Sequence, residues 1–135
     1  MLKACSEQVR LIGMKKIIEL DYYSRFEGYL EIQFILEFSS QKKVIKIWDG
    51  YFNSIMECIK PSLAGWTGLA YYYHLDIGWY DESPWEIPDL ELALEQFRTI
   101  YLPEQKEEEQ VILASIIQLL EEACILNEKV YIDYS

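Results

Sequence analysis

The chain has 135 residues, of which 51% are hydrophobic and 15% aromatic, and its formal net charge is −11 at pH 7. Its length is typical of one domain and its apolar content is too high for disorder, so a single domain over residues 1–135 is predicted. The strong negative charge disfavours nucleic acid and anionic membranes as partners, because both would repel the protein.

Three segments in the first fifty residues are predicted strands: the first two alternate apolar and polar side chains, the pattern of half-buried strands, and the third is β-branched with interspersed lysines. They cover residues 16–23, 29–38 and 43–48. The connectors between them are short and polar, so a meander of sequential antiparallel strands is predicted. The first ten residues fit either a short helix or a frayed tail.

Residues 49–75 are harder to assign. A turn is expected at Asp49, after which residues 51–59 fit either a further strand or a helix that ends before Pro61. The aromatic content of residues 69–75 favours a strand. Residues 76–88 contain two prolines, one glycine and four acids, which predicts a loop, and loops of that length inside compact domains are often functional.

Beyond residue 88 the apolar period becomes that of a helix, with Asp89 as its expected N-cap and Pro103 as its end. A second helix is predicted from about residue 104, with three glutamates at 107–109 where the helix dipole favours negative charge. Asn127 suits its C-cap, and residues 130–134 alternate as a final strand.

Together these elements predict an α+β fold. The antiparallel sheet is expected to combine the N-terminal meander with the C-terminal strand and to pack against two C-terminal helices. Trp48, inside a predicted strand, is expected in the core.

The cysteines indicate a reducing compartment. Cys5, Cys58 and Cys124 are odd in number, far apart, and match neither a disulfide framework nor a metal site. The N-terminus lacks the apolar run of a signal peptide, and no segment reaches the ~20 apolar residues that span a bilayer. We therefore expect a cytoplasmic protein.

No residue pattern in the chain names a reaction. His74 is the only histidine, so neither a catalytic triad nor a transition-metal site is expected, and no glycine-rich phosphate loop is present. No metal or other cofactor is predicted. Two carboxylates held roughly 5–10 Å apart serve glycosidases, so a small hydrolase remains a minor alternative, recognisable by a carboxylate of raised pKa in a pocket.

The acidic side chains are concentrated in one third of the chain. Between Asp76 and Glu109 there are eleven acids and two bases, a net charge of −9. Glutamates from Glu91 onward fit solvated helix faces and helix N-termini. The acids of residues 76–89 gain no such benefit, and they lie among large aromatics, as is typical of protein-recognition surfaces.

A small, acidic, aromatic-rich α+β chain whose residues 78–88 (GWYDESPWEIP) lead into an acidic helix resembles the immunity proteins of bacterial polymorphic and contact-dependent growth inhibition toxin systems. The resemblance is to the general character of that class over the whole chain. It implies a non-enzymatic, cytoplasmic antitoxin that binds a cognate toxin domain, often a basic nuclease, and occludes its active site. Charge complementarity would speed the association.

In this hypothesis one loop supplies both the aromatic anchors and the charges. The predicted partner-binding residues are Asp76, Trp79, Tyr80, Asp81, Glu82, Trp85, Glu86 and Asp89. The alternative is a small-molecule or carbohydrate-binding module whose Trp/Tyr-rich segment lines a cleft. Neither nucleic acid nor a membrane is expected as a partner, and the sequence leaves the oligomeric state open.

Overall fold

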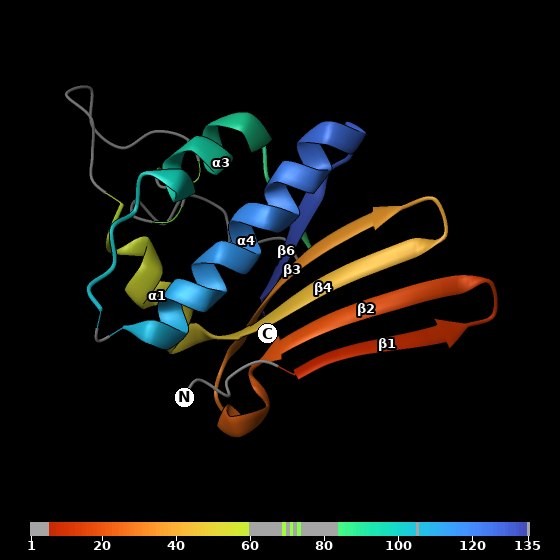
Figure 1. Ribbon diagram of the computed structural model, residues 1–135, viewed down its shortest axis with the longest axis horizontal. Helices are drawn as coiled ribbons and strands as arrows, with labels where there is room; N and C mark the ends of the chain where they lie inside the picture. Colours follow the sequence, from red (N-terminus) through yellow and green to blue (C-terminus); the bar gives the residue numbers. More distant parts are fainter. Residues whose placement is uncertain are drawn as a thin grey trace.

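The computed structural model describes residues 6–59, 69, 71, 73, 84–104 and 106–134 (Figure 1). The fold is α+β, as predicted. Helices pack on one face of a six-stranded mixed sheet whose strand order is β1-β2-β4-β3-β6-β5. The strands are β1 (Ser6–Ile12), β2 (Lys15–Tyr22), β3 (Glu31–Phe38), β4 (Gln41–Trp48), β5 (Trp85–Glu86) and β6 (Val130–Tyr134).

The three predicted N-terminal strands are confirmed as β2, β3 and β4, but their predicted order as a meander is wrong. β3 and β4 form an antiparallel hairpin, and β4 lies between β3 and β2, so β2 and β4 pair in parallel. The connector after β2 is responsible. The Asp21 carboxylate accepts hydrogen bonds from the backbone N–H groups of Tyr23 and Ser24, and the short helix η1 (Ser24–Phe26) follows. This segment passes the end of β4 and therefore crosses two strand spacings, each of about 5 Å.

The N-terminal segment is a strand, and neither a helix nor a tail from Ser6 onward. β1 pairs with β2 along its whole length in an unbroken antiparallel register from Ser6 and Asp21 to Ile12 and Lys15. Gly13 occupies the first position of the two-residue turn with φ of 62°, a conformation that glycine adopts at little cost. The turn explains why this hairpin forms despite the weak alternation of β1.

The predicted helices are confirmed as α3 (Leu90–Arg98) and α4 (Glu107–Leu126). The Asp89 side chain accepts a hydrogen bond from the backbone N–H of Leu92 at 3.1 Å, so it caps α3 as expected. Asn127 caps α4 in the left-handed conformation, with φ of 56°. β6 is the predicted final strand, and it lies beside β3.

Residues after β4 are helical. α1 (Asp49–Met56) begins directly at the end of β4, which decides the open choice for residues 51–59. Leu69, Tyr71 and Tyr73 are also helical, so the strand predicted there is wrong at these positions. Leu69 and Tyr73 are four residues apart, the spacing that places two side chains on one helix face, and both pack against the core.

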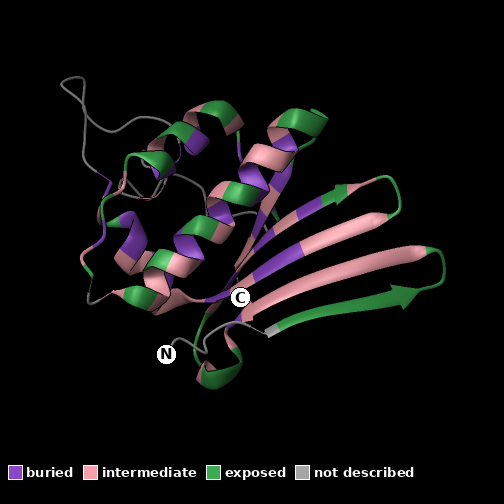
Figure 2. Ribbon diagram, in the orientation of Figure 1, coloured by how far each residue is buried: buried purple, intermediate pink, exposed green. Residues whose placement is uncertain are grey.

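The core lies between the helices and the inner face of the sheet. Phe34 in β3 is fully buried at its centre, with its ring centroid 5.8 Å from that of Phe52 in α1 and 6.3 Å from that of Phe97 in α3. Figure 2 shows the buried residues running along β3 and β4 and along the facing sides of the helices. These aromatic contacts join elements from both halves of the chain.

Trp48 lies at the edge of this core. It is half-buried, and its ring stacks on Phe26 at 4.2 Å and meets Tyr51 edge-on. The expectation of a core tryptophan is therefore confirmed only in part. No helix in the described part of the chain is long and apolar enough to cross a membrane.

Candidate functional site

The structure describes only the last part of the predicted binding loop. Asp76, Trp79, Tyr80, Asp81 and Glu82 lie outside the described residues, as does His74. The described part of the segment runs from residue 84 to Asp89 and contains the remaining three predicted residues.

Trp85 lies in the core. Only 8% of its surface is exposed, and β5, to which it belongs, pairs with β6 so that Trp85 is opposite Ile132. A hydrogen bond from the Ile87 N–H to the Val130 carbonyl extends this attachment. Trp85 therefore holds the segment to the sheet from within, and its burial argues against the expected role of an exposed anchor for a partner.

Glu86 and Asp89 are exposed. The Glu86 carboxylate lies 3.6 Å from the Lys129 ammonium, and Asp89 caps α3. Both acids thus have a structural partner, yet each keeps carboxylate surface open to solvent. β5, which contains Glu86, attaches this end of the predicted binding segment to β6, and Asp89 caps the start of α3 three residues later.

A groove of about 270 Å³ opens where α3 begins and α4 ends. We call it the acidic notch. Its polar lining consists of Asp89, Glu91, Cys124, Asn127 and Glu128, and its apolar lining of Pro88, Leu90 and Ala123. Three carboxylates around one small opening would accept hydrogen bonds from a lysine or arginine side chain, the strongest class of polar contact in proteins.

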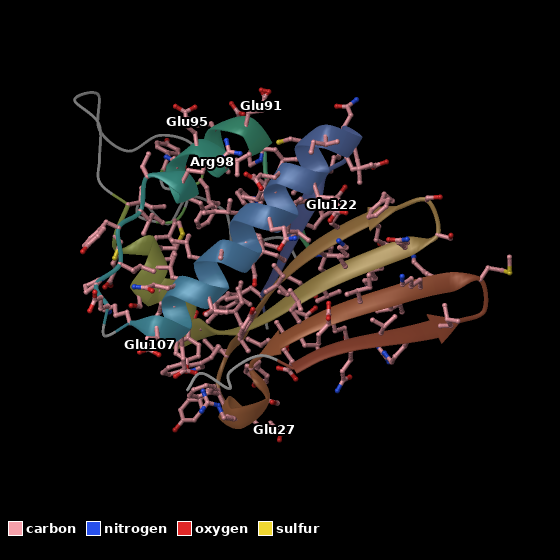
Figure 3. All side chains as sticks on the ribbon, viewed as in Figure 1. Glu27, Glu91, Glu95, Arg98, Glu107 and Glu122 are labelled. Atoms are coloured by element: carbon pink, nitrogen blue, oxygen red, sulfur yellow. The ribbon has the colours of Figure 1, made fainter. Side chains whose placement is uncertain are left out.

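Beyond the acidic notch, acidic side chains continue along the outer side of α3. Figure 3 shows Glu91 and Glu95 pointing away from the sheet, one helical turn apart. Arg98, the nearest base in the sequence, instead binds Glu121 of α4 at 2.5 Å. Within the described residues, no lysine or arginine lies within 4 Å of either the Glu91 or the Glu95 carboxylate. Like charges at this spacing repel one another, and a cationic partner would relieve the repulsion.

The thiol in the acidic notch is not activated. Burial raises the pKa of Cys124, the Glu91 carboxylate raises it further, Arg98 opposes the shift, and Asp89 adds to it. Catalytic cysteines need the opposite, a pKa lowered by positive surroundings. Cys58 and Cys124 are both free, half-buried thiols, whereas Cys5 lies outside the described residues.

The acidic notch belongs to a strongly asymmetric charge distribution. Residues 84–134 carry twelve acids and three bases, a net charge of −9, whereas residues 6–59 carry eight acids and seven bases. The negative charge therefore lies on the helical layer and its connections. The sheet strands β1 to β4 are close to neutral.

Sequence reasoning did not place Glu128 or Cys124 among the predicted binding residues. They lie far from Asp89 along the chain and become its neighbours only because the start of α3 packs against the end of α4. Linear spacing carries no signal for that contact. Among the described residues, no group of three or more histidines, cysteines and acids is arranged to hold a metal ion.

Comparison of the chain with protein-family models, with curated proteins and with solved structures finds no match.

Proposed function

We propose that the protein is a cytoplasmic immunity protein, which binds a cognate toxin domain and occludes its active site. The observation that carries the proposal is the net charge of −9 on residues 84–134, with the acidic notch at the point where the predicted binding loop joins the helical layer. A basic nuclease is the toxin class that such a surface fits best.

The physical argument is one of mimicry. A nuclease active site presents lysines and arginines to the phosphates of its substrate, and clustered carboxylates offer those side chains the same charge and the same hydrogen-bond acceptors. Charge complementarity also accelerates encounter, up to ~10⁸–10⁹ M⁻¹s⁻¹ at low salt. An antitoxin benefits from rapid binding because the toxin damages the cell until it is bound.

In this proposal the two parts of the predicted binding segment, residues 76–89, have different roles. Trp85 attaches it to the sheet, while Trp79 and Tyr80 remain the predicted aromatic anchors for the toxin. Asp89 and Glu91 contribute charge from the edge of the contact. Truncation of an anchor should weaken binding by about 2 kcal/mol or more, whereas loss of a peripheral acid should mainly slow association.

The proposal predicts that a toxin-like C-terminal domain is encoded immediately upstream of this chain, and the test uses that domain, purified with its active site inactivated. Surface plasmon resonance should show a complex whose association rate falls as the salt concentration rises. Coexpression of this chain with the active domain should restore growth. A metabolic operon in place of a toxin gene, or an upstream domain that does not bind, would contradict the proposal.

Charge-reversal variants then test which acidic residues belong to the toxin-binding surface. Asp81→Lys and Glu91→Lys should each lower the association rate about tenfold or more, because each replaces an attraction by a repulsion. Glu27→Lys is the matched control, since Glu27 is exposed and lies on the opposite side of the molecule (Figure 3). If the control and the notch variant slow association equally, the effect is one of net charge and the acidic notch is not part of the interface.

A further inference from the structure

The two edges of the sheet are protected to different extents. At one edge, β5 is only two residues long, and short edge strands offer little for another chain to pair with. At the other edge, β1 has seven residues and an unbroken register, without a bulge or a proline. Among the described strands β1 pairs only with β2, so no described strand pairs with the N–H and C=O groups on its other side.

Three of the seven side chains of β1, those of Val9, Leu11 and Ile12, are apolar and more than half exposed. Val9 is 55% exposed and Leu11 75%, and both lie on the inner face of the sheet, opposite Ile18 and Lys16 of β2. The single base of β1, Arg10, is bound to Glu19 at 3.3 Å on the outer face. Glu7 is the other charged residue of β1, and the strand contains no lysine, the residue that most often keeps an edge strand from pairing.

We infer that β1 pairs with β1 of a second copy of this chain, forming a dimer with a continuous sheet. Charge favours this occupant. The net charge of a second copy is −11, but residues 6–59 carry almost none of it. Two strongly acidic molecules can therefore approach each other at β1 without strong repulsion. A basic partner would instead be drawn to the helical layer.

The sequence of β1 is also self-complementary in the register that uses its full length. Antiparallel pairing of residues 6–12 about a two-fold axis places Val9 opposite Val9 of the second copy. In that register Gln8 lies opposite Arg10 and Glu7 opposite Leu11, so no like charges face one another. The exposed apolar side chains of both copies then form one continuous surface beside the two-fold axis.

Sedimentation equilibrium or light scattering over a range of concentrations tests the dimer. We expect a reversible monomer–dimer equilibrium. Val9→Lys should raise the dimer dissociation constant about tenfold or more, since two lysines then face each other at the two-fold axis. Met14→Lys is the matched control, because Met14 is 92% exposed on the same hairpin but lies beyond β1.

The register has its own test. In a Cys5→Ser background, Val9→Cys should form an intersubunit disulfide on mild oxidation, because the two residues are directly opposite. Leu11→Cys should not, because its symmetry mate lies four residues away along the pair, beyond the reach of a disulfide. The background protein without a new cysteine gives the reference.

Three outcomes would overturn the inference. The first is a monomer at every concentration up to roughly 1 mM, where even an association of about 4 kcal/mol is visible. The second is equal weakening by Val9→Lys and Met14→Lys, which would indicate non-specific apolar association. The third is a dimer in which Leu11→Cys crosslinks as readily as Val9→Cys. Circular dichroism of each variant checks that the fold is retained.

Discussion

The two halves of the sheet place apolar side chains on the same face, but the surroundings of those side chains are opposite. In β3, Ile32, Phe34 and Leu36 face the helices and are fully buried. In β1, Val9 and Leu11 lie on the same face of the same sheet and are exposed. Alternation therefore shows that a strand has two unlike faces, but burial depends on what lies over them.

The same division appears in the charge. The covered half is joined to α3 and α4, which with their connections carry almost all of the net negative charge, whereas the open half is nearly neutral. The proposed toxin-binding surface and the proposed dimer edge thus occupy different parts of the molecule. One can be changed without the other, which makes the two proposals separable.

The largest expected effect is a difference in how much an apolar side chain of each half contributes to the free energy of unfolding. Phe34→Ala should lower the free energy of unfolding by about 3–5 kcal/mol, because it empties the space between Phe52 and Phe97. Leu11→Ala, on the same face of the open half, should change the stability of the monomer by less than about 0.5 kcal/mol. Urea unfolding at low protein concentration measures both. Similar losses for the two variants would mean that the open half is covered in solution.

A smaller effect distinguishes the structural from the electrostatic role of Asp89. Asp89→Ala removes the cap of α3 and should cost about 1 kcal/mol of stability. Asp89→Asn keeps a side-chain oxygen for the Leu92 N–H while it removes the charge, so it should be nearly neutral for unfolding. Thermal or urea unfolding checks this pair. If both variants destabilise equally, the charge on the helix dipole matters more than the hydrogen bond.

The last effect depends on pH and concerns Tyr51 of α1. Burial raises the pKa of Tyr51 to about 12, and the nearby Glu108 carboxylate acts in the same direction. The folded state therefore holds the phenol proton more strongly than the unfolded chain, whose tyrosine pKa is near 10. This contribution to stability is complete below pH 10 and is lost as the pH rises towards 12.

Tyr51→Phe should accordingly flatten the alkaline decline in stability. The difference between the unfolding free energies of the two proteins should stay constant below pH 10 and change between pH 10 and 12. Absorbance titration of the phenolate provides the second readout, since the variant should lack one late-titrating tyrosine. An unchanged alkaline curve in Tyr51→Phe would place the raised pKa elsewhere among the eleven tyrosines.

The candidate site shows how far local reasoning extends. The sequence predicted a functional segment ending at Asp89 and assigned Glu91 to an ordinary solvated helix face. The structure places Glu91 with Asp89 in the acidic notch and moves Trp85 into the core. No spacing rule relates Glu128 to Asp89, because both line the acidic notch only through the packing of α3 against α4.

The sequence by itself determined the elements whose cause is local. The alternation of β3, the Asp89 cap, the apolar period of α4 and the left-handed Asn127 all rest on interactions within a few residues. Only the tertiary structure decided the parallel pairing of β2 with β4, the burial of Trp85 and the exposure of β1. These features depend on which distant segments meet. Backbone pairing and apolar burial stabilise a contact however far apart its residues lie in the sequence, so local patterns do not reveal it.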